Sequence, residues 1–535
     1  MAGATGRRLL WLARRPGRPY AGSKAAQYAA KSVGESMTST AAKAHPADAP
    51  AGDNHHARGQ RLGLGMLGLY GSGMLVQDTM AFGLGTLLLF YLTVVCGMSG
   101  SAAGFVLGLA LVVDSFIDPL VGSLSDNSRS RHGRRHPFMI LSALPTVIAF
   151  ALLFSVPAGL TGGALFAYAL TALLVARIGL SGFQVPYIAL GAELSDDYAE
   201  RSTIVASRVF FTVLGTFAAA FLAYGVFLKG AGGQTHRAAY APYAWTCGAI
   251  VLSGAALASF GTLGSRHRLH AAAPGQGAAF GRLGAEVVEV FKNRSFRILF
   301  TACLILFVAL GAAAALGLHA NTYFWKLPTS AILLIALSTP VGSFFGIFVA
   351  ASLGRVLEKR ILAMLGISLI GVAQFFPAVL KVAGLLPAGI GPGEIALIIA
   401  GTVGGVGASF ALIGFQSMMA DAADEHEQLF GARREGLYFA GISLSAKASS
   451  GIGALIAGVV LDLIGFPHGG AGAHVALAAI PAATIRNLGL AYGPGASMLT
   501  ALSVITLLSY RRGRREHEAV REALLERREA AEAGG

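Results

Sequence analysis

From Leu62 onward the chain is dominated by apolar segments, each about 20 residues or longer and separated by polar stretches. An α-helix of this length crosses the roughly 30 Å of hydrocarbon in a bilayer. We expect twelve such spans, at 62–93, 102–124, 137–158, 164–190, 206–228, 241–264, 297–318, 329–353, 360–381, 390–415, 436–465 and 488–510. The runs are continuously apolar and do not alternate with polar residues, which argues against a β-barrel. The sequence therefore predicts an all-α polytopic membrane protein.

The composition agrees with this class and narrows the partners. Charged residues form 13% of the chain, whereas a soluble domain carries about 25%. The net charge of +14 comes from Lys and Arg between apolar segments, where they orient a membrane protein, so we expect no nucleic-acid partner. Cys96, Cys247 and Cys303 show no paired spacing, which gives no support for a disulfide framework or a zinc site.

Basic residues gather in the loops after the second, sixth, eighth and twelfth spans, at 129–135, 266–297, 355–360 and 511–515. The positive-inside rule therefore predicts that both termini and the central loop at 265–296 lie in the cytoplasm. This loop separates a six-helix half at 61–264 from a second half at 297–510. Two such halves are the pattern of the major facilitator fold, whose substrate binds between the halves near the membrane midplane.

Several polar segments lie outside the predicted spans. Residues 1–60 are expected to form a disordered or targeting-like tail; alternatively, the start codon is misassigned and Met37 or Met66 is the true start. Residues 511–535 are expected to form a charged, helical and solvated cytosolic tail. The loops "SDDYAER" and "DAADEHEQLFGARREG" are expected to hold charge pairs on the cytoplasmic face, and the histidine of "DEHEQ" is expected to be solvated.

The second span carries two aspartates, Asp114 and Asp118, one helical turn apart on the same face. A charged side chain at mid-membrane costs about 2.5–3.5 kcal/mol. Two ionised carboxylates also repel each other, so either one is protonated or a cation lies between them. Pro119 has no N–H for the carbonyl of Ser115, which adds an oxygen. Such hard ligands suit Na⁺ or H⁺; the alternative is that both acids only pair with basic groups in the membrane.

Other polar side chains lie at membrane depth. Asp78 belongs to the first span and Lys447 to the eleventh, while Arg177, Ser181 and Gln184 share one face of the fourth. Lys447 is expected either to hold a structural ion pair with one of the two aspartates, or to release it when a coupling ion binds. We find no nucleophile–base pair and no metal-binding motif, so we do not expect an enzyme or a cofactor.

Three stretches carry a resemblance to a known family. They are "DSFIDPLVGSLSDNSRSRHGRRHPF", "QVPYIALGAELSDDYAERSTIVASRVFF" and "MMADAADEHEQLFGARREGLYFAGISLSAK". Together they resemble the most recognisable stretches of the glycoside–pentoside–hexuronide:cation symporters, which belong to the major facilitator superfamily. The likeness runs from about Tyr70 to about Gly465, which covers most of both predicted halves.

This resemblance implies roles for particular residues. Asp114 and Asp118 match the family's two cation-binding carboxylates, with Ser181 completing the Na⁺ or H⁺ site and Lys447 as its counter-charge. The residues implied to contact the sugar are Asp78, Arg208, Ser443 and, at positions where the family has other side chains, Gln184 and Gln77. No metal is implied beyond Na⁺ at the two aspartates.

The sequence also departs from the family's pattern. Ile117 replaces an asparagine beside the cation pair, and Ile188 replaces a tryptophan on which a galactosyl ring would stack. Gln184 replaces a second sugar-binding aspartate, Gln77 replaces a lysine, and Arg177 is an additional cation. The pocket is therefore less acidic, which favours an anionic sugar such as a hexuronide. Equally, Arg177 could neutralise one aspartate and weaken cation coupling, and both interpretations stay open.

We therefore expect a secondary active transporter, a monomer that couples Na⁺ or H⁺ to symport of a sugar, glycoside or hexuronide. It is expected in a bacterial-type inner membrane and to work by alternating access. Two alternatives stay open. One is an uncoupled facilitator or a carrier of a lipid-like or other non-sugar solute, and the other is a membrane sensor that transports nothing.

Overall fold

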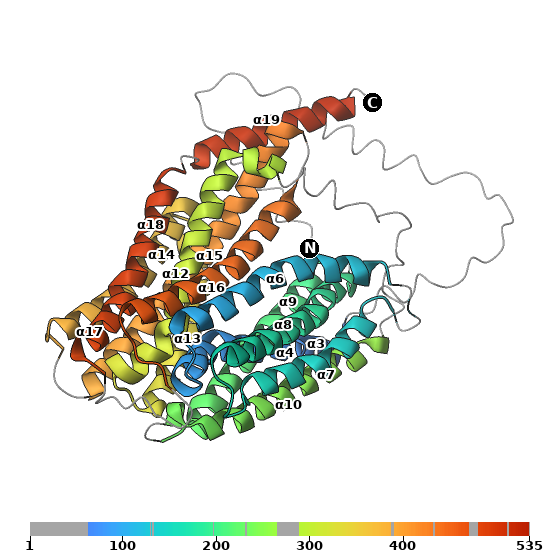
Figure 1. Ribbon diagram of the computed structural model, residues 1–535. Coiled ribbons are helices and arrows are strands. Elements are labelled where there is room, and N and C mark those ends of the chain that lie inside the picture. The colour runs from blue at the N-terminus through green and yellow to red at the C-terminus, as the bar shows by residue number, and fades with distance from the viewer. Residues whose placement is uncertain are drawn as a thin grey trace, which may run out of the picture. The chain divides into compact units, whose positions relative to one another are not determined.

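The computed structural model describes residues 62–128, 130, 133–195, 197–230, 233–264, 288–386, 390–431, 434–469, 480–510 and 513–533. The predictions for residues 1–60 and for most of the central loop fall outside these ranges. Within them, all regular secondary structure is helical (Figure 1). Twelve helical spans are long and apolar enough to cross a membrane, which confirms the predicted class.

Eight spans are single helices: α6 (Gly100–Asp126), α7 (His136–Leu153), α8 (Gly162–Glu193), α10 (Arg237–Gly261), α13 (Thr329–Leu353), α14 (Lys359–Val382), α15 (Ile390–Phe430) and α16 (Glu435–Leu463). The other four combine α-helical with wider π-helical turns. The first span consists of α3 (Leu64–Gly71), α4 (Met74–Phe82), η2 (Gly83–Leu87), α5 (Leu88–Phe90) and η3 (Tyr91–Val95). The fifth consists of α9 (Tyr198–Ala220) and η4 (Phe221–Phe227), and the seventh of α12 (Arg294–His319) and η7 (Ala320–Phe324). The twelfth consists of α17 (Ala482–Leu490), η9 (Ala491–Gly495) and α18 (Ala496–Leu508). A short 3₁₀ turn, η5 (Gly233–Thr235), and the C-terminal helix α19 (Arg514–Ala533) complete the described elements.

The two ends of the helix bundle differ, and we name them by their residues. The basic end is where α6 ends at Asp126, α8 at Glu193, α13 at Leu353 and α15 at Phe430. The closed end is the opposite one, where α6 begins at Gly100 and α16 ends at Leu463.

At the closed end, α6 and α16 pack main chain against main chain. The contact is made by small residues, Gly100, Gly104 and Gly108 of α6 against Gly458, Ala454 and Gly451 of α16, which we call the glycine seam. A Cβ added to Gly104 would lie 2.8 Å from the carbonyl oxygen of Ala454, closer than such atoms approach in proteins. Small residues therefore allow a backbone approach that larger side chains would prevent.

Polar contacts beside the glycine seam join α6 to α16 and the first span to α12. Asp462 on α16 accepts hydrogen bonds from the backbone N–H groups of Gly100 (2.8 Å) and Ser101 (2.7 Å), which begin α6. The hydroxyl of Thr93 donates to the Leu89 carbonyl at 2.8 Å. The same hydroxyl forms a hydrogen bond of 2.9 Å with Nε2 of the fully buried His319 on α12. These contacts connect elements from the two predicted six-helix halves.

Toward the basic end, α6 and α16 diverge (Figure 1). Lys447 of α16 still contacts Asp118 of α6. Ser443, one turn further toward the basic end, is exposed. The two helices are thus packed together at the glycine seam and lie further apart toward the basic end.

The tenth span corrects a sequence prediction. We expected it at 390–415, followed by a charged loop, but α15 continues to Phe430 through the acidic stretch. No glycine or proline interrupts the chain between Gly414 and Gly431, and the residues there are mostly good helix formers. Gly431, with a positive φ of 77°, ends the helix.

The histidine of this stretch is buried, although we had expected it to be solvated. His426 is fully buried on α15, and its ring packs against Phe430 and Tyr438, with centroid distances of 4.6 and 5.6 Å. Its Nε2 lies 3.2 Å from Glu289 Oε1. The prediction was wrong because it placed the residue in a loop, whereas the extended helix turns it toward the aromatic side chains.

The C-terminal segment is helical, as predicted, but it is not fully solvated. Figure 1 shows α19 lying across the basic end of the bundle. Val520 and Leu524 of α19 are buried, and His517 Nε2 lies 3.3 Å from Asp421 Oδ1 on α15. Lys359 of α14 also donates to Asp421, at 2.7 Å. The helix therefore docks through one face, because its apolar residues recur at helical spacing.

Candidate functional site

Helix α6 carries Asp114 and Asp118 in the middle of the bundle. Asp114 is only 4% exposed. Pro119 follows directly inside the helix, so the carbonyl of Ser115 has no N–H donor one turn later. The Ser115 hydroxyl itself donates back to the carbonyl of Leu111 at 3.0 Å. The helix thus holds two acids and a main-chain oxygen within one turn.

Lys447 reaches both acids from α16. Its Nζ contacts Asp118 Oδ2 and lies 3.5 Å from Asp114 Oδ2. The Lys447 side chain is 40% exposed, so water retains access to the ammonium. Because α6 and α16 diverge just beyond this point, the pair lies at the boundary between the closed and the open parts of the bundle.

Helix α8 supplies two further side chains, one turn apart. Ser181 donates a hydrogen bond to Asp114 Oδ1 at 2.7 Å. Arg177 Nη1 lies 3.8 Å from Asp114 Oδ2. The structure therefore brings together Asp114, Asp118, Arg177, Ser181 and Lys447, which we call the cation cluster.

A second group of polar side chains surrounds Asp78 on α4. Arg208 and Thr212 of α9 face this carboxylate, and Thr212 lies within hydrogen-bonding reach of it. Arg208 also reaches the hydroxyl of Tyr70. The Tyr70 ring stacks on that of Tyr187 at a centroid distance of 4.7 Å. We call Tyr70, Asp78, Gln184, Tyr187, Arg208 and Thr212 the substrate cluster.

Several buried atoms of the substrate cluster find no hydrogen-bond partner among the described residues. They are Asp78 Oδ2, Gln184 Oε1, the Tyr187 hydroxyl and Arg208 Nε. Gln184 Nε2 makes only a long contact of 3.9 Å with the sulfur of Met74. Buried polar groups are almost always paired, so acceptors and donors left over at one place suit a polar solute or water.

Not every predicted site residue joins these clusters. Gln77 lies half-buried on α4 and Ser443 is exposed on α16. Within the described residues, neither makes a hydrogen bond or ion pair with the cation cluster or the substrate cluster. Ile188 is 42% exposed on the face of α8 that carries Ser181 and Gln184, where it presents an aliphatic surface.

Sequence reasoning missed Tyr70, Tyr187 and Thr212. Aromatic residues and threonines are common in membrane helices, so none of the three stands out in an apolar segment. A signal did exist for Tyr187, which lies three residues after Gln184 and hence near the same face of α8.

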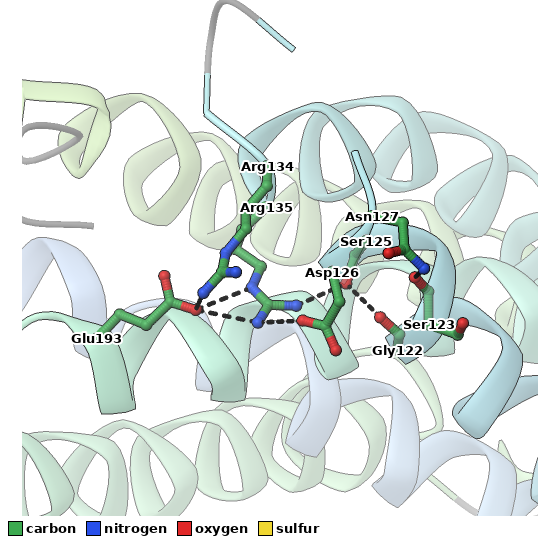
Figure 2. A network of polar contacts seen from close by, with 8 residues as sticks. All are labelled: Gly122, Ser123, Ser125, Asp126, Asn127, Arg134, Arg135 and Glu193. Carbon is green, nitrogen blue, oxygen red and sulfur yellow. Dashed lines mark hydrogen bonds and ion pairs between the residues drawn. The ribbon is translucent and has the colours of Figure 1, made fainter. Parts of the chain in front are cut away.

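Charged side chains tie three helices together at the basic end (Figure 2). Glu193, at the end of α8, accepts from Arg134 at 2.6 Å and from Arg135 at 3.0 and 3.2 Å. Arg135 precedes α7, and it also pairs with Asp126 at 2.5 Å and donates to the Ser125 hydroxyl at 2.8 Å. This network therefore fixes the ends of α6 and α8 to the start of α7.

The sequence matches the family described as MFS/sugar transport protein over residues 69–512. Among curated proteins, it is 23% identical over 429 residues to the isoprimeverose transporter of Lactiplantibacillus pentosus, covering 80% of this chain and 84% of that protein. It is 24% identical over 392 residues to the glucuronide carrier protein homolog of Escherichia coli, covering 73% and 82%. A shorter match, 34% over 137 residues, is to the mouse sodium-dependent lysophosphatidylcholine symporter 1, covering 25% and 26%.

Solved structures share the fold at low sequence identity. The nucleoside transporter NupG superposes with a TM-score of 0.56 at 15% identity, covering 84% of this chain and 99% of that one. A D-xylose-proton symporter superposes with a TM-score of 0.54 at 14% identity, covering 84% of this chain and 97% of that one. The fold is therefore the major facilitator fold predicted from the sequence. The chain belongs to the MFS/sugar transport protein family, and it is an integral, multi-pass membrane transporter rather than an enzyme.

Proposed function

We propose that this protein is a cation-coupled symporter of a sugar, glycoside or hexuronide. The observation that carries the proposal is the position of the cation cluster. Two carboxylates in a membrane helix are bridged to Lys447, which belongs to a helix of the other predicted half. The unpartnered oxygens and nitrogens of the substrate cluster suit a solute rich in hydroxyl groups. The names of the isoprimeverose and glucuronide relatives support the same class of solute.

The orientation is part of the proposal. Arg134, Arg135, Arg294, Lys359 and Arg360 all lie at the basic end. By the positive-inside rule this end faces the cytoplasm, and both termini lie there as well. We also propose that this membrane is a bacterial-type inner membrane. In this orientation, the structure corresponds to a state that is shut toward the outside and open toward the cytoplasm.

The geometry suggests how ion binding and movement are linked. Lys447 belongs to the proposed C-terminal half, residues 297–510, and its acidic partners to the N-terminal half, residues 61–264. A cation at Asp118 competes with Lys447 for the same carboxylate, so binding weakens a contact between the halves. The solute, held by the substrate cluster, is then exposed to one side of the membrane at a time.

The driving force is large enough to concentrate a sugar. One positive charge moving through 100 mV provides about 2.3 kcal/mol. A tenfold ion gradient adds about 1.4 kcal/mol. Together they sustain roughly several-hundredfold accumulation of a neutral solute that is carried with one cation.

The first test is a thermal-shift screen of the purified protein against sugars, uronates and glycosides, with and without Na⁺. The solutes that stabilise the protein are then used for uptake into proteoliposomes, with a Na⁺ gradient or a proton gradient imposed separately. We expect at least one gradient to drive accumulation, and Asp114→Asn to lose it. Uptake that is indifferent to both ions would remove symport from the proposal and leave a facilitator.

A second candidate is the carrier of a lipid-like solute. It is favoured by the match to the mouse lysophosphatidylcholine symporter, although that match covers only a quarter of the chain. The same thermal-shift screen includes lysophosphatidylcholine below its micellar concentration. Stabilisation by this lipid, with none by any sugar, would favour the second candidate over the first.

A further inference from the structure

His319 lies where the two predicted halves meet at the closed end. It belongs to α12, and its Nε2 forms a hydrogen bond of 2.9 Å with the hydroxyl of Thr93 in the first half. Its ring packs against Phe90 of the first half and against Phe466, which follows α16, at centroid distances of 5.0 and 5.5 Å. The side chain is fully buried. His319 is therefore part of a contact that has to break when the closed end opens.

The surroundings of His319 hold no group that would balance a positive charge. Among the described residues, no Asp or Glu pairs with it, and its Nδ1 finds no hydrogen-bond partner. A protonated imidazole would bring a charge and an unpaired N–H into this aromatic contact. Burying such a charge without a partner is costly. The closed end therefore shuts readily only when His319 is neutral.

The other titratable side chains at this place do not change that conclusion. Tyr91 of η3 and Tyr323 of η7 belong to elements that pack against this part of the molecule, and phenols stay neutral well above pH 7.5. Asp462 is engaged with the start of α6 and lies 3.4 Å from Nε2 of His468. Both residues of that pair belong to the second half, so the pair can persist when the closed end opens.

The imidazole behaves differently once the two halves separate. The contact with Thr93 is then broken, and the ring meets water. A hydrated imidazole has a pKa of about 6.5, so about nine-tenths of it is neutral at about pH 7.5 and about one-tenth at about pH 5.5. Because the neutral form is the one that can be buried again, the ratio of shut to open molecules falls about tenfold between these two values.

We propose that His319 is a pH-sensitive gate residue, which allows the closed end to shut when its imidazole is neutral and holds this end open when it is protonated. In the step, a hydronium ion gives its proton to a ring nitrogen of the hydrated imidazole, an N–H bond forms, and water is released. The same proton returns to water before the end shuts. The inference goes beyond the proposed function, because it concerns neither the solute nor the coupling ion. In the proposed orientation, His319 responds to the pH outside the cell.

The experiment measures hydrogen–deuterium exchange of two backbone N–H groups that cross the closed end. The N–H of Gly100 donates to Asp462 at 2.8 Å, and that of Gly469 donates to the carbonyl of Thr93 at 3.1 Å. Opening of the closed end breaks both bonds together. The purified protein exchanges at about pH 7.5 and about pH 5.5, and each rate is divided by that of the unfolded protein at the same pH. The quotient gives the ratio of open to shut molecules, which we expect to be about tenfold higher at the lower pH.

Three variants assign the response to one side chain. His319→Gln is polar but does not titrate in this range, so its ratio should be the same at both pH values. His468→Gln changes another histidine of the closed end and is the matched control, which should keep the tenfold rise. Thr93→Val removes the hydrogen-bond partner but retains the imidazole. It should open more at both pH values and keep the rise, which provides a test even where His319→Gln does not fold.

The outcomes separate this inference from the proposed function. A wild-type ratio that does not change with pH overturns the inference. So does a rise that persists in His319→Gln or disappears in His468→Gln. Uptake that is indifferent to both ion gradients would defeat the proposed symport, whereas the exchange measurement needs neither a solute nor a gradient and would stand unchanged.

Discussion

Replacing Asp462 by alanine removes a connection between α16 and the first turn of α6. The carboxylate accepts from the backbone N–H groups of Gly100 at 2.8 Å and Ser101 at 2.7 Å. These are two of the N–H groups that the start of a helix leaves without an internal partner. The negative charge also meets the positive end of the helix dipole. We therefore expect the substitution to favour opening of the closed end.

The magnitude follows from the two hydrogen bonds. Loss of a side-chain cap at a helix N-terminus costs about 0.5–2 kcal/mol. Here one charged group serves two donors, but its side chain is 28% exposed and water replaces part of what is lost. We expect the shut state of the closed end to lose about 2 kcal/mol of stability. The ratio of molecules in which this end is open to molecules in which it is shut then rises about 30-fold.

The assay is a distance measurement between two spin labels at the closed end. Ala158, between α7 and α8, and Ala383, after α14, are exposed and belong to different predicted halves. The native cysteines, Cys96, Cys247 and Cys303, are free and buried, and are replaced by alanine beforehand. Double electron–electron resonance on this background then gives the populations of short and long distances, with and without Asp462→Ala.

The control variant tests whether Asp462 holds the two predicted halves together or only caps the start of α6. Ser99 caps α6 from within the same segment, because its hydroxyl accepts from the N–H of Ala102 at 3.4 Å. Ser99→Ala should lower the melting temperature slightly without changing the distance distribution. Our reasoning is wrong if Asp462→Ala leaves the distribution unchanged, or if Ser99→Ala shifts it equally.

Three further changes test other parts of the structure. Ser181→Ala removes the hydrogen bond to Asp114 and should weaken binding of the coupling ion about tenfold. The measurement is the ion concentration that gives half-maximal uptake, and an unchanged value would exclude Ser181 from the site. Gly104→Ala places a Cβ 2.8 Å from the Ala454 carbonyl and should destabilise the shut closed end by about 1–3 kcal/mol; an unaltered spin-label distribution would contradict the tight packing of the glycine seam. Leu524→Asp puts a charge on the docked face of α19 and should make the tail cleavable by trypsin within minutes. Leu525→Asp changes an exposed position and should leave the tail resistant. Equal resistance of both variants would mean that α19 does not dock through Leu524.

The twelve spans could be predicted because each is a long, uniformly apolar run, and length and hydropathy define a membrane helix. Their ends could not be predicted equally well. Helix α15 continues for fifteen residues past the expected end at 415, because polar residues stop a membrane span but do not stop a helix. His426 was misjudged for the same reason.

The cation cluster was largely accessible from the sequence. Asp114, Asp118, Ser181 and Lys447 each interrupt an apolar segment, and helical spacing sets the faces they share. The contact between Thr93 and His319 was not accessible, because it requires knowing which helices of the two halves are neighbours. Tyr70 and Tyr187 could not be predicted, because tyrosine is common in membrane helices and does not stand out in an apolar segment.

The glycine seam bears on how fast this protein can work. A surface that has to separate and close again in every cycle usually requires many side chains to settle into one rotamer, and each immobilised side chain costs conformational entropy. Glycine has no rotamers, so the backbones of α6 and α16 can part and rejoin with little reordering. A contact of this kind is tight when shut and leaves few loose side chains behind when open, which suits a gate that operates repeatedly.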